Sequence, residues 1–313
     1  MSARTLPALL LLAACGGHGA SGASASASAS AQPPASAAAP VPAAPAATPR
    51  PSTAAPADPN PLRLPPAKLA LDPGHRVFTF PEPMLAAARP GATLVLQPAI
   101  VKDFDGDDLV IDGRGGPEYK VHAGYAIAVP DDPRLKPGDP VIAEHNGALK
   151  HGVVTKFVRD RVGVRFTDLE GRAPELMLLG GSGKPIAGEA SKALRLIKQL
   201  EGLRPGNYAA LRRGEEWLHV LLVSASGEGD ARRWFALGYG GAAMIVMESE
   251  LLPIPVRFAT KPGRTVWAES GGKMRRATVE KEGDRGLFIV KFERAGRAQA
   301  VGWGRLMVPQ QDG

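Results

Sequence analysis

The sequence predicts a mostly β fold, in which small barrels follow one another along the chain as two pairs joined by one helix. Three features favour this fold class: apolar and polar residues alternate over short stretches, glycine and proline separate these stretches, and a long internal repeat restarts the pattern. A segment rich in alanine, serine and proline comes first and is expected to be disordered. The predicted boundaries are residues 1–14 for a leader, 15–61 for the disordered segment, 62–182 for the first barrel pair, 183–203 for the linking helix and 204–313 for the second pair.

The leader has the composition of an export signal. Arg4 precedes an apolar stretch over residues 6–14, which is too short to span a bilayer as a permanent helix. Cys15, the single cysteine of the chain, follows directly, and residues 12–15, LAAC, resemble the bacterial lipobox. This resemblance implies that a diacylglycerol is attached to the thiol of Cys15 and that the signal peptide is cleaved before it. The alternative is an ordinary secretory signal with an incidental cysteine.

Lipidation of Cys15 would make a membrane the first partner of the chain. Each buried methylene contributes about 0.8 kcal/mol, so two or more acyl chains, palmitate among them, would hold the protein stably. The residue after the cysteine is Gly16 rather than aspartate. By the same resemblance, this favours a place in the cell envelope, lipid-anchored at the outer membrane.

The segment after the cysteine reads as a spacer. Over residues 16–61 its only formal charges are Arg50 and Asp58, and it has no aromatic residue. It cannot bury enough apolar surface to offset the entropy of ordering. As a coil, about 46 residues would span roughly 35–40 Å on average.

The remaining chain, from about residue 62, contains all of the tryptophan, tyrosine and phenylalanine. With Cys15 lipidated no disulfide can form, so packing alone must stabilise the fold. The formal net charge of +7 is a mild excess that allows attraction to anionic polymers without requiring it. Export removes nucleic acid as the expected partner.

An internal repeat determines the predicted architecture. Residues 136–144, KPGDPVIAE, match residues 261–269, KPGRTVWAE, and the match continues to 176–177 and 306–307 at offsets between 125 and 130. Such a period indicates a repeated structural unit.

Two weaker copies begin at Pro90-Gly91 and Pro205-Gly206, and each leads into a short apolar stretch, at 93–96 or 208–211. Proline presets its dihedral and glycine accepts a positive one, so Pro-Gly predicts a turn before the first strand of each unit. Four or five short strands in roughly 45–65 residues can close into a small barrel without exposed edges.

The pattern PGxxVxA, followed by a hairpin and then VxF, resembles the Tudor-like branch of the SH3-like barrels. The resemblance covers residues 135–180 and 260–310 well, and 89–130 and 204–252 loosely. It implies a binding or scaffold module, and the family often holds methylated side chains in an aromatic cage. The stretches that correspond to the cage, 149–152 and 274–277, contain no aromatic residue, which argues against methyl-cation binding.

The linking helix is predicted over residues 187–201. Gly202 follows it, where a helix-ending glycine is expected. Its apolar face, which we expect to pack the two barrel pairs together, consists of Ala190, Ala193, Leu194, Ile197 and Leu200.

No catalytic or metal-ligating set is recognised in the sequence, and no cofactor is expected. His145 and His151 flank one hairpin turn, but no recognised ligand spacing completes a metal site. The acidic run at 103–108 is typical of a hairpin turn, because it lacks the glycine and glutamate of an EF-hand loop. Ser224 and Ser226 lie near His219 in sequence without the glycine pattern of a nucleophile elbow, and residues 238–241, GYGG, predict a bend.

The sequence therefore favours a non-enzymatic lipoprotein of the envelope that binds or scaffolds an envelope protein or a wall polymer. The alternative is a wall-directed hydrolase or carrier with a site between the barrel pairs. The candidate ligand contacts are Trp217, Trp267 and Trp303, for each of which a place in a barrel core is the competing interpretation. Trp267 stands where the sister unit has Ile142, and Trp303 lies between two glycines.

Overall fold

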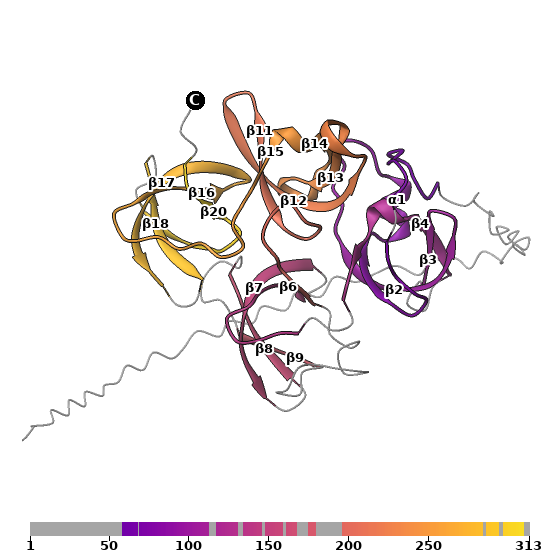
Figure 1. Cartoon of the computed structure of the whole chain (residues 1–313), viewed down its shortest axis with the longest axis horizontal. Helices are drawn as coiled ribbons and strands as arrows, with labels where there is room; N and C mark the ends of the chain where they lie inside the picture. The colour runs from indigo at the N-terminus through magenta and orange to yellow at the C-terminus, as the bar shows by residue number, and fades with distance from the viewer. Residues whose placement is uncertain are drawn as a thin grey trace, which may run out of the picture. The chain divides into compact units, whose positions relative to one another are not determined.

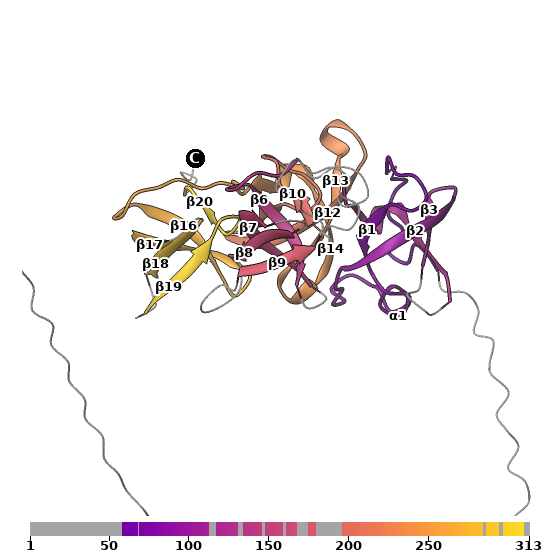
Figure 2. The same ribbon diagram turned by 90° about the horizontal axis from the view of Figure 1, so that it is seen from below.

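The computed structural model describes residues 58–67, 69–112, 117–130, 134–145, 148–158, 161–167, 175–179, 196–283, 286–293 and 297–309. The predicted signal peptide, Cys15 and nearly all of the predicted spacer lie outside these residues, as does the predicted helix as far as residue 195. The described chain is mostly β, with twenty strands and one short α-helix (Figures 1 and 2). No helix among these residues is long and apolar enough to cross a membrane.

The twenty strands fall into four repeats of five, all with one order. In each repeat the pairs are antiparallel, successive strands from the first to the fourth are neighbours, and the fifth strand returns to pair with the first. Repeat 1 contains β1 (Arg76–Thr79), β2 (Gln97–Asp105), β3 (Asp108–Ile111), β4 (Tyr119–His122) and β5 (Ile127–Ala128), with α1 (Glu82–Ala86) between β1 and β2. Repeat 2 contains β6 (Pro140–His145), β7 (Ala148–Val158), β8 (Arg161–Phe166), β9 (Glu175–Leu179) and β10 (Leu196–Lys198).

Repeats 3 and 4 follow the same order and join in one ten-stranded sheet. Repeat 3 contains β11 (Tyr208–Arg213), β12 (Glu216–Ser226), β13 (Arg233–Leu237), β14 (Ala243–Met247) and β15 (Leu251–Pro253). Repeat 4 contains β16 (Thr265–Ser270), β17 (Lys273–Glu282), β18 (Leu287–Phe292), β19 (Ala298–Gly302) and β20 (Leu306–Met307). The two repeats meet where Leu218 of β12 pairs with Lys273 of β17.

One turn begins every repeat. A Pro-Gly dipeptide, with the glycine at positive φ, precedes the first strand, and the glycine N–H donates a hydrogen bond to a carbonyl on the second strand. The second strand has a β-bulge directly after that carbonyl in all four repeats, and a bulge bends and twists its strand. The glycine–acceptor pairs are Gly74–Val101, Gly138–Val154, Gly206–Leu222 and Gly263–Val279, at 2.7, 2.8, 2.7 and 2.7 Å.

The start predicted for the first unit was wrong. Repeat 1 begins at Pro73-Gly74, because Gly74 and not Gly91 makes the shared bond to the second strand. Pro90-Gly91 lies inside the connection between β1 and β2, which also carries α1. Residues 93–96 form no strand of their own, and only Thr93 makes an isolated bridge, to Ala242.

The end of the predicted linking helix is also different in the structure. Leu196–Lys198 is β10, which pairs with Val141–Ala143 of β6 and so supplies the fifth strand of repeat 2. Leu196 is fully buried in the core of that repeat. Three apolar or amphipathic residues fit a strand as well as a helix, and pairing with the open edge of β6 decides between them.

The described contacts do not follow the two predicted pairs. The largest apolar cluster combines repeat 1 with Val223, Phe235, Leu237 and Ala243 of repeat 3, and with Ile197 of repeat 2. Repeats 2 and 4 each have a smaller core of their own. Repeat 1 therefore packs mainly on repeat 3, while strand pairing joins repeat 3 to repeat 4.

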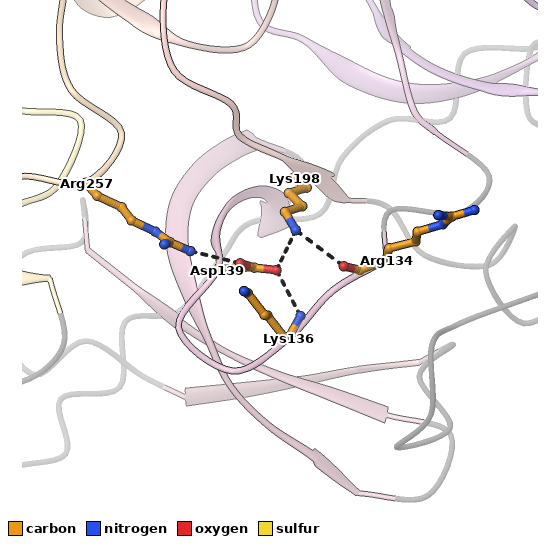
Figure 3. A network of polar contacts seen from close by, with 5 residues as sticks. All are labelled: Arg134, Lys136, Asp139, Lys198 and Arg257. Atoms are coloured by element: carbon orange, nitrogen blue, oxygen red, sulfur yellow. Dashed lines mark hydrogen bonds and ion pairs between the residues drawn. The ribbon is translucent and has the colours of Figure 1, made fainter.

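A buried carboxylate links repeat 2 to a later part of the chain. Asp139, in the turn before β6, is 0% exposed. Its Oδ2 accepts from the N–H of Lys136 and from Nζ of Lys198, both at 2.9 Å, and its Oδ1 accepts from Arg257 at 2.9 Å (Figure 3). Arg257 lies between β15 and β16, so Asp139 holds the connection of repeats 3 and 4 against repeat 2. Because the carboxylate is buried, removing both cations would leave it without a charged partner, and removing the carboxylate would leave two cations facing each other.

Candidate functional site

Two of the three candidate tryptophans lie together. Trp217 comes from β12 of repeat 3 and Trp267 from β16 of repeat 4, and both are half-buried. Their ring centroids are 5.6 Å apart at an interplanar angle of 61°, an edge-to-face contact. The guanidinium of Arg212 lies 5.9 Å from the centre of the Trp217 ring. The Leu218–Lys273 strand pairing brings these rings together, since it joins the two repeats one residue after Trp217.

The tryptophans cover a small apolar core at the junction of repeats 3 and 4. Its buried members are Ala210, Ile254, Met274 and Met307, and the indole rings pack over them. The rings are therefore held by the protein while part of each stays accessible. Such a fixed aromatic surface loses little entropy when a ligand covers it.

A groove of about 550 Å³ runs beside the pair, and we call it the tryptophan groove. Glu216 of the β11–β12 hairpin forms an ion pair with Lys273, whose Nζ lies 2.6 and 2.8 Å from the two carboxylate oxygens. In a second ion pair, Nε of Arg276 lies 3.5 Å from Oε1 of Glu293. The groove is thus lined by apolar side chains and by charged side chains of both signs. Its lining residues are Glu215, Glu216, Trp217, Trp267, Ser270, Lys273, Met274, Arg275, Arg276, Phe292, Glu293 and Gln299.

Trp303 does not line this groove, and its half-buried ring packs against the core of repeat 4. Its Nε1–H donates to the carbonyl of Phe258 at 3.0 Å, and its ring lies against Gly286, where a Cβ atom would come within 2.9 Å of it. Trp303 thus lies away from the other two, against the apolar cluster of repeat 4. Cys15 is outside the described residues.

The remaining residues singled out in the sequence have structural partners. The backbones of Asp105 and Asp108 are strand partners at the end of the β2–β3 hairpin, so the turn predicted in the acidic run is confirmed. The hydroxyl of Ser224 donates to the carbonyl of Gly124 at 2.5 Å and so ties repeat 3 to repeat 1. Residues 238–241 form the predicted bend, which ends at positive φ in Gly240 and Gly241. The described residues contain no group of three or more potential metal ligands.

A polar cluster that the sequence analysis missed lies where repeats 2, 3 and 4 meet, and we call it the central cluster. The ring of Tyr208 stacks on His151 at 3.9 Å and lies 4.1 Å from His219. A ring nitrogen of His219, Nε2, is 2.9 Å from the carbonyl of Gly304, and that geometry assigns the proton to this nitrogen. These residues come from repeats 2, 3 and 4, so no local spacing in the sequence could have revealed the cluster.

Next to this cluster is an ion pair within repeat 4. Glu269 Oε2 accepts from Nε of Arg305 at 2.7 Å and from Nη2 of the same guanidinium, while Oε1 accepts from the N–H of Gly272 at 2.7 Å. Burial would raise the pKa of Glu269, but Arg305 and the Gly272 N–H hold it below its usual value. Glu269 therefore stays ionised and fixes the position of Arg305.

No protein-family model matches the sequence, and no curated protein matches it. Among solved structures, the four MBT repeats of Drosophila melanogaster Sfmbt, in complex with a methylated peptide, are similar over 76% of this chain and 88% of that chain. The sequence identity is 9% and the TM-score is 0.16. Likeness at this level assigns no residue of this chain to a site, and the groove and the cluster stand on their own geometry.

Proposed function

We propose that the protein is a lipid-anchored envelope lipoprotein whose repeats form a non-enzymatic binding module, with the tryptophan groove as its ligand site. The contact between Trp217 and Trp267 is the observation that supports the groove as the binding site. These two half-buried indoles come from different repeats and lie beside a groove of about 550 Å³. Tryptophan is enriched where binding energy concentrates, and a pocket of this size fits a few side chains of a partner.

We propose further that the ligand is an extended segment of another envelope protein. The apolar side chains of the groove suit an aliphatic or aromatic side chain of such a segment. The groove is also lined by glutamates on the β11–β12 hairpin and cations on β17, so both signs of charge meet the ligand. A peptide can present both signs at a spacing of a few residues, whereas a repeating polymer presents one pattern throughout.

The test places a photo-crosslinking residue in the groove of the protein in its own cells. We expect Trp217→p-benzoylphenylalanine to give a discrete adduct with an envelope protein upon illumination. Trp303→p-benzoylphenylalanine, equally half-buried but outside the groove, should not give this adduct. Adding Trp267→Ala should reduce the adduct by about tenfold or more, since losing a central tryptophan contact costs roughly 2 kcal/mol.

Two results would contradict this proposal in different ways. An adduct with wall polymer alone would overturn the choice of a protein ligand. Adducts that are equally abundant with and without Trp267 would remove the groove as the binding site.

The alternative hypothesis, a wall hydrolase, gains no support from the residues that line the cavity where the four repeats meet. Glycoside hydrolysis uses two carboxyl groups, one of them held protonated. Among the described residues that line the cavity at this junction, Glu269 is the one carboxylate, and its pKa is lowered by Arg305 rather than raised. We therefore propose binding without hydrolysis.

A further inference from the structure

A second cavity, separate from the tryptophan groove, lies where all four repeats meet. Its volume is about 390 Å³, and we call it the junction cavity. Repeat 1 contributes Leu94 and Leu96, repeat 2 contributes Leu149 and Lys150, and repeats 3 and 4 supply the other walls. No residue of this cavity lines the tryptophan groove.

The lining of the junction cavity combines apolar and polar side chains. Five leucines of one apolar cluster line it, and so do charged and polar side chains around the Glu269–Arg305 pair. The cavity thus offers an apolar surface and a polar surface to the same ligand. The leucines are Leu94, Leu96, Leu149, Leu221 and Leu237.

The charged side chains that line the cavity have a net positive charge. Lys150 and Arg305 are cations and Glu269 is an anion, so these three lining residues sum to one positive charge (2 − 1). Burial lowers the pKa of His219 to about 4, so this lining residue adds no charge at neutral pH.

The arginine is already in a fixed position. Glu269 is 6% exposed and binds Nε and Nη2 of Arg305, so Nη1 takes no part in this pair. The N–H of Gly272 holds the other carboxylate oxygen. A guanidinium that is fixed before binding loses less entropy when it meets an anion.

We propose that the junction cavity binds a small amphipathic organic acid, with the anionic group beside Lys150 and Arg305 and the apolar body against the leucines. A volume of about 390 Å³ matches a ligand of drug size, for which buried apolar area supplies most of the affinity and a few polar groups fix the orientation. The inference does not depend on the tryptophan groove or on its ligand.

Two fluorescent probes that differ in charge test this proposal. 8-Anilinonaphthalene-1-sulfonate and N-phenyl-1-naphthylamine share their ring systems, but only the first carries an anionic group. The full chain, produced without export so that no acyl group competes for the probes, is titrated with each. We expect one bound sulfonate probe per chain, and weaker binding of the neutral probe.

Two charge variants distinguish binding of the anionic group in the cavity from general attraction of the probe to surface cations. Lys150→Gln should lower the affinity for the sulfonate probe by about fivefold, which is the effect of losing one partly exposed ion contact. It should leave the affinity for the neutral probe unchanged. Lys281→Gln removes an equal charge from an exposed position on β17 and should change neither.

A filling variant provides the second test. Leu221→Trp puts an indole into the cavity and should displace both probes, with circular dichroism confirming that the variant is folded. Equal binding of the two probes, equal effects of the two lysine variants, or undiminished probe binding by folded Leu221→Trp would overturn the proposal. None of these results bears on cross-linking through Trp217.

Discussion

At the scale of single residues, the two histidines of the central cluster are held neutral by burial. His151 is 2% exposed, and burial lowers its pKa to about 3, with smaller contributions from nearby His219, Arg305 and Lys150. Burial likewise lowers the pKa of His219 to about 4, against the opposing effect of its hydrogen bond to Gly304. Both imidazoles pack against Tyr208 as neutral rings, and protonating His151 would bury a charge.

Acid should therefore begin to destabilise the protein at a pH well above the pKa values of these histidines in the folded state. Their unfolded pKa is near 6.5, so the unfolded state binds protons that the folded state excludes, and stability falls as the pH drops below that value. Between pH 7.5 and pH 5 each histidine should lower the free energy of unfolding by about 2 kcal/mol. Urea unfolding at both pH values measures the change.

His151→Gln provides the comparison for this prediction. The glutamine cannot titrate, so the variant should lose about 2 kcal/mol less than the native protein over the same pH interval, whatever its stability at pH 7.5. An equal loss in both proteins would mean that His151 does not set the acid sensitivity.

The sequence could identify single residues as candidates, but not their neighbours. Trp217, Trp267 and Trp303 were chosen as ligand contacts by residue type, and the structure brings only the first two together. Trp303 could not be separated from them beforehand, because its hydrogen bond to Phe258 joins residues 45 positions apart. Tyr208, Glu269 and Arg305 were missed for the same reason.

At the scale of elements, the turn and bulge that recur in each repeat explain how far prediction could go. In repeats 2, 3 and 4 the Pro-Gly turn and the acceptor carbonyl are 16 residues apart, as in Gly138 to Val154, so the pattern is visible in the sequence. In repeat 1 the distance is 27 residues, from Gly74 to Val101, because the connection carries α1 and a second Pro-Gly. Because of this longer connection, the start of repeat 1 was predicted at Pro90-Gly91 instead of Pro73-Gly74. The predicted linking helix failed at β10 because pairing with β6, which no local period reveals, determines its structure.

The shared turn also gives a matched pair of substitutions. Gly206 and Gly263 hold the same position at φ values of 86° and 82°, where an L-residue is strained by roughly 1–2 kcal/mol. A Cβ at Gly263 would meet nothing within 4 Å, but at Gly206 it would come within 2.9 Å of Cδ1 of Ile142, which is fully buried.

Gly263→Ala should thus lower the free energy of unfolding by about 1 kcal/mol, and Gly206→Ala by more, since Ile142 must move as well. Calorimetric unfolding of the two variants beside the native chain measures the difference. Equal losses would show that the buried isoleucine moves without cost and that the dihedral alone determines the effect.

At the scale of the whole molecule, the repeats depend on one another. Repeat 1 completes its core with Phe235 and Leu237 of repeat 3, Asp139 of repeat 2 binds Arg257 beyond repeat 3, and one sheet spans repeats 3 and 4. A unit of about 60 residues buries little surface alone, so shared cores stabilise what single repeats could not. This dependence keeps both the tryptophan groove and the junction cavity in fixed positions, because each is lined by more than one repeat.

The proposed membrane anchor is the last property that would belong to the chain as a whole. We expect the protein to sediment with membranes and to resist a high-salt wash, since acyl burial at about 0.8 kcal/mol per methylene is insensitive to ionic strength whereas attraction through surface cations is screened. Cys15→Ser should abolish incorporation of a labelled palmitate and leave the signal peptide uncleaved. Adding Ser30→Cys to that variant restores a thiol within the predicted spacer and should restore neither, because the proposed lipidation signal is residues 12–15 and not the thiol alone. Labelled palmitate in the Cys15→Ser protein, or cleavage that continues without Cys15, would refute the anchor while leaving the two binding sites to their own tests.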